Sequence, residues 1–380
     1  MFALTHSTLF DGERLLERQA VVIEQDRIVA IQPEASLGAE LPRHSLNGAL
    51  LSAGFIDLQL NGCGGVMFNN DISTRTLDTM HRTNLGSGTT SFLPTLITSP
   101  DRDMQQAVAV TQDYMARHQH RVLGLHLEGP YTNLERKGIH PAAQIRQLDE
   151  PMLEFLCRHA AVIAKITLAP ECNHPAHIRR LKAAGIMVAM GHTAATYDEA
   201  MAGFDAGVGF ATHLYNAMPP TLNGRSPGAV GAVFDSETVY AGIIVDGVHV
   251  HDANVRLAHK VLGQRLCLVT DATAAAGAGP ELTRFNFCGT PVLVRDGRCV
   301  DEHGTLGGSA LTMIAGVKNL VERVGLPLEE ALCMASLYPA RALGLDHELG
   351  AIAVGKVANL VVLSHRLDVK ATLVNGRFST

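Results

Sequence analysis

The residues best able to do chemistry stand where apolar, strand-like runs end. Glu128 ends one such run and lies in the motif HLEGP. His192, in MGHT, and His213, in THLYNAM, each follow another run. A carboxylate and two imidazoles form the ligand set of a catalytic divalent-metal site, in which a further position stays open for water. We therefore predict one metal ion per chain on these three residues. Zinc is the default, and Fe2+, Co2+ or Ni2+ suits the same ligands.

A further carboxylate, Asp271, follows the last strand-like run in TDAT. A bound metal polarises a carbonyl group and lowers the pKa of its water to about 7. Asp271 could take the proton of that water and pass it to a leaving amine. The residue types thus indicate metal-assisted hydrolysis of an amide.

Taken singly, each of these residues has a more ordinary explanation. A histidine after an apolar strand is more often structural than a ligand, and an aspartate there often caps the next helix. Together they favour a site, because gathering so many polar groups in a protein interior is costly without a ligand.

A second group could bind an anion. Arg225 stands in the Gly/Pro-rich segment NGRSPG, whose backbone N–H groups could surround a phosphate while the guanidinium binds it bidentately. His249, in DGVH, could assist. Arg225 could equally be a solvated loop arginine, and the role of His140, in KGIHP, is open in the same way. We interpret Cys63, in NGCGG, as a packing residue.

The elements that position these residues alternate along the chain. Amphipathic stretches separate several of the eight apolar, strand-like runs, which are GFIDLQL, TSFLPTLI, RVLGLHL, AKITLA, GIMVAM, GVGFAT, TVYAGIIV and RLCLVT. Apolar strands that alternate with helices predict a parallel sheet covered on both faces, and eight of them favour a (β/α)8 barrel. In such a barrel the chemistry lies at the carboxyl ends of the strands.

Both chain ends depart from this pattern. Residues 1–50 and 346–380 are typical of short strands, and Asn375-Gly376 is a hairpin signal. We predict that the two ends pair into one small β-sandwich-like module, with the catalytic barrel, residues 51–345, inserted between them. A β-rich stretch near residues 280–304 interrupts the barrel and would join that module or cover the barrel mouth.

Composition limits the partners and the compartment. Net charge is −6 without a dense basic run, which argues against nucleic acid as a partner. No apolar run reaches the roughly 18 residues of a membrane-spanning helix, and the first residues lack the features of a signal peptide. The seven cysteines, without a CxxC pair, fit free thiols in a reducing compartment. We expect a cytoplasmic protein with neither a membrane nor a nucleic-acid partner.

Twelve motifs run through nearly the whole chain: GFIDLQLNGCGG, LPTLITS, GLHLEGP, KITLAPE, GHTAAT, ATHLYNAM, GRSPG, DGVHV, LVTDAT, LGGSALTM, LYPARALGL and GAIAVGKVANLVVL. They resemble the N-acetylglucosamine-6-phosphate deacetylases, a branch of the amidohydrolase superfamily. The resemblance implies hydrolysis of N-acetyl-D-glucosamine 6-phosphate to D-glucosamine 6-phosphate and acetate, by attack of metal-bound water with Asp271 as base and acid. It also implies a homodimer, sometimes with residues of the neighbouring subunit near the phosphate.

The resemblance also implies substrate contacts. His140 would help to bind and polarise the substrate around its acetyl group, and Asn216 and Ala217 would offer backbone donors. The remaining sugar-phosphate contacts would come from Arg225, His249, Leu306, Gly307 and Gly308.

One position departs from the wider superfamily. Many members carry His-x-His at the end of the first barrel strand, which supplies a second metal, but this chain has Gln59 and Asn61 there. Neutral amides are poor ligands for a transition metal, and one deacetylase subgroup with this replacement uses a single metal. We predict a mononuclear site, with Gln59 and Asn61 behind the ligands or marking a lost second-metal position.

Two alternatives remain. A cyclic-amide hydrolase of the dihydroorotase or hydantoinase kind would share the fold, but such enzymes usually bridge two metals with a carboxylated lysine near the end of strand four. Lys165 stands at the start of that run. A non-catalytic barrel relative would have lost a metal ligand or the acid/base residue, and all four are present.

Overall fold

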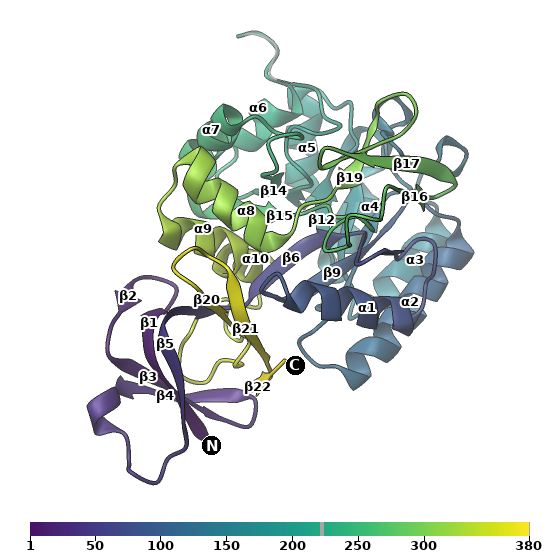
Figure 1. The fold of residues 1–380 in the computed structure, drawn as a ribbon. Helices are drawn as coiled ribbons and strands as arrows, with labels where there is room; N and C mark the ends of the chain where they lie inside the picture. Colours follow the sequence, from purple (N-terminus) through teal and green to yellow (C-terminus); the bar gives the residue numbers. More distant parts are fainter. Residues whose placement is uncertain (221–223, 380) are drawn as a thin grey trace.

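The computed structural model describes residues 1–220 and 224–379, and its main body is a barrel of eight parallel strands (Figure 1). In order of pairing, the strands are β6 (Phe55–Leu60), β9 (Thr89–Ile97), β10 (Leu125–Glu128), β11 (Ile163–Leu168), β12 (Met187–Met190), β13 (Val208–Ala211), β14 (Tyr240–Ile244) and β15 (Leu266–Val269). A bridge between Leu60 and Ala272 closes the barrel. The predicted (β/α)8 fold is confirmed, since each predicted run overlaps one of these strands.

The barrel strands are buried on both faces, as near-continuous apolar runs require. Every residue of β6 and β9 is buried. One buried polar group inside is fully paired: the ring nitrogens of His126 lie 3.0 Å from the Thr95 hydroxyl and 2.7 Å from the Thr167 hydroxyl. His126, another histidine at a strand end, is therefore a satisfied core residue.

Helices cover the outside of the barrel. They are α1 (Thr74–Leu85), α2 (Asp101–Arg117), α3 (Glu150–Arg158), α4 (Pro175–Ala183), α5 (Tyr197–Ala206), α6 (Gly228–Asp235), α7 (Asp252–Leu262), α8 (Met313–Asn319), α9 (Leu328–Ala335) and α10 (Leu337–Ala342). Helix α5 begins with a capping box between Thr196 and Glu199, which satisfies two backbone N–H groups at its first turn. Within the described residues, no helix combines the length and the hydropathy that a membrane crossing needs.

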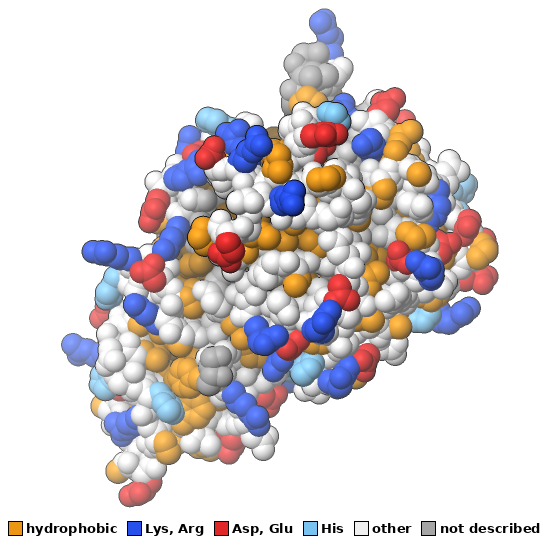
Figure 2. Space-filling view, turned by 45° about the vertical axis from the view of Figure 1, so that its right-hand side comes forward, with side chains coloured by type: hydrophobic (Ala, Val, Ile, Leu, Met, Phe, Trp, Pro, Cys, Tyr) orange, Lys and Arg blue, Asp and Glu red, His pale blue; other side chains and the backbone are white. Residues whose placement is uncertain are grey.

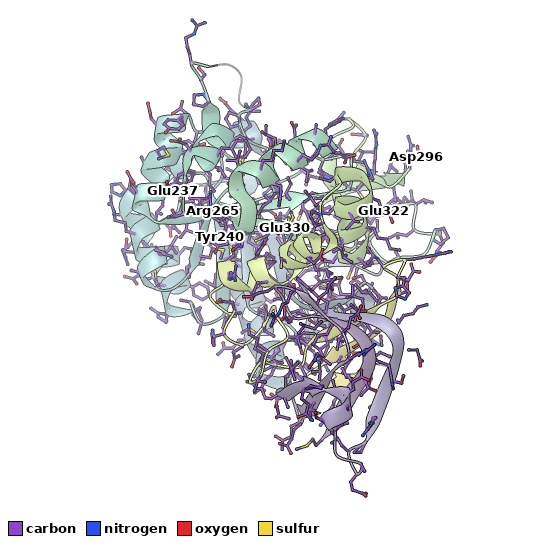
Figure 3. The ribbon with its side chains drawn as sticks, turned by 90° about the vertical axis from the view of Figure 1, so that its left-hand side faces the viewer. Glu237, Tyr240, Arg265, Asp296, Glu322 and Glu330 are labelled. Atoms are coloured by element: carbon purple, nitrogen blue, oxygen red, sulfur yellow. The ribbon has the colours of Figure 1, made fainter. Side chains whose placement is uncertain are left out.

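A hydrogen-bonded cluster holds the last helices together. Glu330, on α9, lies 2.9 Å from the ring of His259 on α7 and accepts a hydrogen bond from the Tyr338 hydroxyl on α10, also at 2.9 Å. Figure 3 shows Glu330 among these helices on one side of the barrel. The contacts join three helices that follow the last two strands.

The two chain ends build one mixed sheet of eight strands. They are β1 (Phe2–Phe10), β2 (Leu15–Leu16), β3 (Gln19–Glu24), β4 (Arg27–Pro33), β5 (Arg43–Ala53), β20 (Leu360–Leu363), β21 (Val369–Val374) and β22 (Arg377–Phe378). β20 pairs antiparallel with β5, so the C-terminal strands continue the N-terminal sheet. The sheet curls around one core, which contains Leu4, Ile23, Leu51, Leu360 and Leu373. The sandwich-like module is thus a single curled sheet.

Local signals at the ends of the chain behave as predicted. Asn375 and Gly376 join β21 to β22 with φ of 50° and 71°, and a two-residue type I′ hairpin requires positive φ at both positions. The predicted domain boundaries stay a proposal. Strand β5 crosses the predicted boundary at residue 50 and ends at Ala53.

A four-stranded antiparallel sheet is inserted between β15 and α8. Its strands are β16 (Arg284–Phe287), β17 (Thr290–Arg295), β18 (Arg298–Val300) and β19 (Leu306–Ser309). Phe287 and Val292 share a buried core with Ile97 at the end of β9, and Ser309 is bridged to Ala272. Of the two positions that we considered for this stretch, it takes the one over the barrel mouth (Figure 1).

Candidate active site

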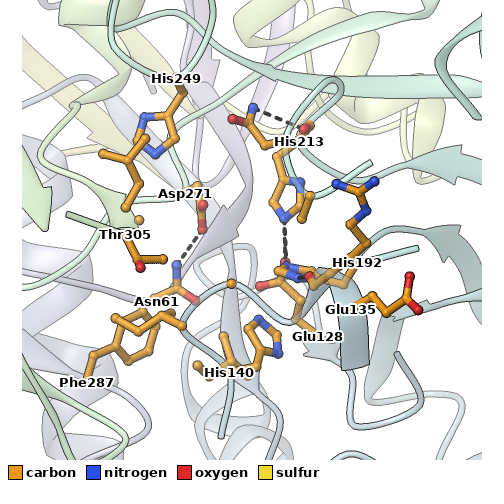
Figure 4. A pocket seen from close by; sticks show the side chains of 18 residues that line it. Asn61, Glu128, Glu135, His140, His192, His213, His249, Asp271, Phe287 and Thr305 are labelled. Atoms are coloured by element: carbon orange, nitrogen blue, oxygen red, sulfur yellow. Dashed lines mark hydrogen bonds and ion pairs between the residues drawn. The ribbon is translucent and has the colours of Figure 1, made fainter. Parts of the chain in front are cut away.

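A cavity of about 350 Å³ opens at the carboxyl ends of the barrel strands, beside the insertion (Figure 4). Parallel strands bring residues that are distant in sequence to this one rim. Most of the predicted site residues line the cavity, namely Asn61, Glu128, His140, His192, His213, Asn216, Ala217, His249, Asp271, Leu306 and Gly308.

The three predicted metal ligands meet at one point. Glu128 Oε1 lies 2.9 Å from His213 Nε2 and 3.3 Å from His192 Nε2, and the two Nε2 atoms are 3.1 Å apart. Ligands bound to zinc at about 2.0–2.1 Å in a tetrahedron would be separated by about 3.3 Å. The spacing is therefore that of atoms around one small cation.

The chemistry of these donors also fits a cation. His192 Nδ1 lies 2.8 Å from the Arg136 carbonyl oxygen, so this nitrogen carries the proton and Nε2 presents a lone pair. That lone pair faces the Glu128 carboxylate and the His213 ring, and all three residues are buried. His213 Nε2 can supply at most one proton to this group. A shared cation relieves the remaining repulsion between lone pairs.

Strained backbone aims three of these side chains into the cavity. The φ angle is 48° at His192, 33° at His213 and 49° at Asp271. Non-glycine residues rarely adopt positive φ, and such residues concentrate at functional sites where surrounding contacts hold them. Ser309 holds Asp271 by donating its N–H to the Asp271 carbonyl oxygen at 2.9 Å. A Cβ at Gly308 would lie 2.7 Å from that oxygen, which explains the glycine.

Gln59 and Asn61 connect the two carboxylates. Gln59 Nε2 donates to Glu128 Oε1 at 3.0 Å and to Asp271 Oδ1 at 3.1 Å, and Asn61 Nδ2 donates to Asp271 Oδ1 at 2.7 Å. Both amide nitrogens thus face carboxylate oxygens. The amide oxygens, through which an amide would ligate a metal, are buried without a hydrogen-bond partner among the described residues. The two residues orient Glu128 and Asp271.

Asp271 has the environment of an acid/base group. Burial raises the pKa of its carboxyl group above the ordinary value, and the nearby Glu128 carboxylate raises it further. Asn61 and Gln59 both donate to Oδ1, so Oδ2 is the oxygen left to exchange a proton. A raised carboxyl pKa near the operating pH is what general acid/base catalysis requires.

His140 lies beside the predicted metal ligands Glu128 and His192. It is buried, its Nδ1 lies 2.8 Å from the Thr98 hydroxyl, and its ring centroid is 4.1 Å from that of His192. Possible ligand atoms of Glu128, His140 and His192 lie within 4.8 Å of one another. Burial, and next the His192 ring, hold the pKa of His140 well below its ordinary value. The imidazole is therefore neutral, with Nε2 available to a substrate.

His249 is held at the opposite rim by Asp246. Its Nδ1 lies 2.7 Å from Asp246 Oδ2, while Asp246 Oδ1 accepts the N–H groups of Val248 and His249. Burial opposes ionisation of Asp246, but the contact with His249 outweighs it and lowers the pKa of Asp246. The carboxylate fixes the ring so that its other nitrogen can meet a ligand.

The loop after β13 is also shaped for the cavity. The Asn216 side chain donates to the His213 carbonyl oxygen at 3.2 Å, and Ala217 has a φ of 51°. The Ala217 carbonyl oxygen accepts the Thr193 N–H at 3.1 Å, which joins this loop to the loop that carries His192.

Three predicted residues are not among the described residues that line the cavity: Gln59, which lies behind the two carboxylates, Arg225 and Gly307. Arg225 borders a separate cavity with Thr196, Pro220 and Pro227, and is not among the described residues that line the candidate site. Figures 1 and 2 show the described part of the segment between β13 and α6 projecting beyond the body of the barrel. Gly307 lies behind the lining, where a Cβ would come within 2.5 Å of Ile139 Cδ1.

Sequence reasoning missed several lining residues, among them Ile97, Glu135, Arg136, Ile139, Phe287 and Thr305. Glu135 and Arg136 immediately precede KGIHP, so the position of His140 could have pointed to them. The apolar residues carried no signal, because nothing in the sequence distinguishes a cavity wall from ordinary core.

Comparisons with known proteins agree with this geometry. The amidohydrolase family model matches residues 50–378, and the NagA composite domain matches residues 1–51. An N-acetylglucosamine-6-phosphate deacetylase from Haemophilus influenzae is 48% identical over 377 residues, which cover 99% of each chain. The chain belongs to the N-acetylglucosamine-6-phosphate deacetylase family. The resemblance carried by the motifs is thereby confirmed.

Solved members of the deacetylase family have the same fold. The crystal structure of N-acetylglucosamine-6-phosphate deacetylase from Pasteurella multocida is 51% identical, with a TM-score of 0.98 over 100% of this chain and 99% of that one. A mutant of the Mycobacterium smegmatis deacetylase, solved with N-acetyl-D-glucosamine-6-phosphate, is 32% identical, with a TM-score of 0.91 over 99% and 98% of the two chains.

The family also contains relatives named for an epimeric sugar. An N-acetylgalactosamine-6-phosphate deacetylase from a Shewanella species is 37% identical over 366 residues, which cover 95% of this chain and 92% of that protein. The configuration of the sugar therefore has to be tested directly.

Proposed function

We propose that this protein removes the N-acetyl group from N-acetyl-D-glucosamine 6-phosphate, giving D-glucosamine 6-phosphate and acetate. One observation carries the proposal: Glu128, His192 and His213 converge within 3.3 Å at the barrel mouth, in the same cavity as Asp271. The family supports the substrate, because relatives across the full length of the chain are named for this reaction.

We assign Glu128, His192 and His213 as ligands of one divalent ion. When bound, such an ion supplies Lewis acidity, which polarises an amide carbonyl and acidifies water. Gln59 supports a mononuclear site, because a neutral amide is a poor ligand for a second transition metal and its nitrogen is engaged with Glu128 Oε1. We retain zinc as the default metal. Activity of metal-depleted protein should return after one equivalent of Zn2+ per chain, and a need for two equivalents would overturn the assignment.

The protein groups account for the proton transfers. Asp271 Oδ2 would accept a proton from the attacking water as the new C–O bond forms. It would then return that proton to the amide nitrogen as the C–N bond breaks, so that acetate and a free amine leave. Neutral His140 would donate to the carbonyl oxygen from Nε2, since Nδ1 is engaged with Thr98.

We propose that Arg225 reaches the phosphate of the neighbouring subunit's substrate in a homodimer, while His249 binds the sugar phosphate within its own site. Arg225 borders a different cavity from the metal ligands of its own chain, and its segment projects outward (Figure 1).

A cytoplasmic location also remains a proposal, supported by seven cysteines that are all free thiols.

The cyclic-amide alternative receives less support. Lys165 lies fully buried in β11, where its ammonium group is 4.4 Å from the centre of the Phe210 ring, and the amides of Gln59 and Asn61 face carboxylates. A non-catalytic role is disfavoured by the convergence of all four reactive groups.

The deciding experiment is steady-state kinetics over a small substrate panel. It compares N-acetylglucosamine 6-phosphate, its galactose epimer, unphosphorylated N-acetylglucosamine and dihydroorotate. We expect the highest kcat/KM on N-acetylglucosamine 6-phosphate. A higher value on the cyclic amide would reject the proposed function, and a higher value on the epimer would reassign the sugar. Arg225→Ala should lose activity mainly on the phosphorylated sugars.

A further inference from the structure

One wall of the cavity is formed by large apolar side chains. Ile97 at the end of β9, Ile139 in the loop after β10 and Phe287 at the end of β16 line it together and belong to one hydrophobic cluster. We call these three residues the apolar wall. Figure 4 shows Phe287 beside Asn61 and His140, with His249 on the far side of the cavity. The wall therefore adjoins the reactive groups and lies away from the residue assigned to the sugar phosphate.

The wall is held rigidly from behind. Phe287 and Ile97 are only 1% and 2% exposed and pack with Met67 and Val292. Asn69 fixes the backbone of Ile97 from both sides, accepting its N–H at 3.0 Å and donating to its carbonyl oxygen at 3.2 Å. A close-packed wall of this kind cannot recede by the width of a methylene without cost.

The substrate offers one chemical match for this surface. An N-acetylated sugar phosphate carries hydroxyl groups, a phosphate and an amide, and its acetyl methyl is its one apolar substituent. Burying that methyl against apolar atoms is favourable, whereas burying a hydroxyl there without a partner is costly. Ile139 directly precedes His140, the residue assigned to the acetyl carbonyl, so the wall lies where the acyl group would be.

We propose that Ile97, Ile139 and Phe287 receive the methyl of the N-acyl group and limit the length of acyl chain that the enzyme accepts. The inference rests on the proposed function and adds a specificity determinant to it. A methylene that a pocket accommodates or excludes changes kcat/KM by roughly 10–200-fold. We therefore expect the wild type to prefer the N-acetyl over the N-butanoyl substrate by at least about tenfold.

The test compares acyl selectivity in wall variants and in a matched control. Glucosamine 6-phosphate carrying N-acetyl, N-propanoyl or N-butanoyl groups is assayed with the metal-loaded protein. Phe287→Ala and Ile139→Ala should each raise the ratio of butanoyl to acetyl kcat/KM by about tenfold or more. The control is Val294→Ala, which truncates a residue packed against the same cluster that is not among the described residues lining the cavity, and it should keep the wild-type ratio.

The outcomes separate the two levels of the proposal. If the wild type hydrolyses none of the three substrates, the proposed function itself fails. If it hydrolyses the N-acetyl substrate but neither wall variant changes the ratio, or Val294→Ala changes it equally, the wall is ordinary core and the inference is wrong. Ile139 is only half-buried, so Ile139→Ala keeps the test decisive if Phe287→Ala does not fold.

Discussion

At the scale of single residues, the contacts of two buried carboxylates, Glu128 and Asp271, shift their pKa values in opposite directions. Glu128 accepts from Gln59 and contacts two histidines, and those contacts overcome burial and hold its pKa well below the ordinary value. Asp271 lacks a histidine contact of this kind among the described residues, and burial raises its pKa. One carboxylate is thus suited to a ligand and the other to proton transfer.

We predict that Asp271→Asn will bind metal and substrate but turn over at least ~100-fold more slowly, the usual scale for loss of a general acid/base. Asparagine keeps an oxygen that can accept from Asn61 and Gln59, as Oδ1 of Asp271 does. Its amide nitrogen cannot accept a proton. Metal content and substrate affinity serve as controls, and a near wild-type kcat would reject the assigned role.

A pH prediction follows from His81, a buried histidine on α1 far from the metal ligands in sequence. Its Nδ1 has no hydrogen-bond partner among the described residues. Burial, and next the positive charge of Arg121, lower its pKa from 6.5 to about 3. The folded state therefore keeps His81 neutral where the unfolded state binds a proton. Its contribution to stability is complete above about pH 6.5 and is lost as the pH falls toward about 3.

Between pH 7.5 and 5.5, wild type should lose about 1.4 kcal/mol more stability than His81→Asn. The measurement is urea unfolding of both proteins at the two pH values. Exposed His303 provides the control, because His303→Asn should follow the wild type. Parallel pH profiles for wild type and His81→Asn would contradict the prediction.

At the scale of elements, loops after the strands hold two of the proposed metal ligands, His192 and His213. Glu171 joins two of these loops: it accepts from the Thr193 hydroxyl at 2.6 Å, the Ala194 N–H at 2.7 Å and the Asn133 amide at 3.0 Å. Asn133 in turn donates its N–H to the His192 carbonyl oxygen at 2.8 Å. The backbone at His192 has positive φ, so its orientation depends on this support.

Glu171→Ala should therefore weaken metal binding by about 10–100-fold, the range for loss of a residue that supports a metal ligand. The affinity is read from competition with a chelator, and kcat at saturating metal should change less. Glu150→Ala, which removes an exposed partner of Arg180, is the matched control. Equal metal affinities in the two variants would show that Glu171 does not support His192.

At the scale of the whole molecule, the proposed homodimer makes a distinct prediction. Mixing Asp271→Asn with Arg225→Ala subunits produces heterodimers in which one of the two sites has its own Asp271 and the partner's Arg225 intact. A random mixture should recover about a quarter of the wild-type activity. Each variant alone should stay low. If Arg225 acts within its own subunit, or if the protein is a monomer, mixing will restore nothing.

Much of this molecule follows from local pattern. The eight apolar runs and the Asn375-Gly376 turn predicted the barrel strands and the last hairpin, because strand burial and turn geometry depend on a few neighbouring residues. Strand-end positions predicted the reactive part of the cavity lining, since parallel strands share one rim, whereas Asn216, Ala217, Leu306 and Gly308 came from the family resemblance. Gly307 stands behind the lining, because its place depends on the packing of Ile139.

The sequence by itself determined the repeated βα order, the residue types of the proposed metal site and the family motifs. Tertiary structure decided which side chains face one another: His126 is satisfied inside the barrel by Thr95 and Thr167, while His192 and His213 meet Glu128. All three histidines lie in or just after similar apolar runs. What separates them is the contacts made by strands and loops distant in the chain, and no local sequence pattern records those contacts.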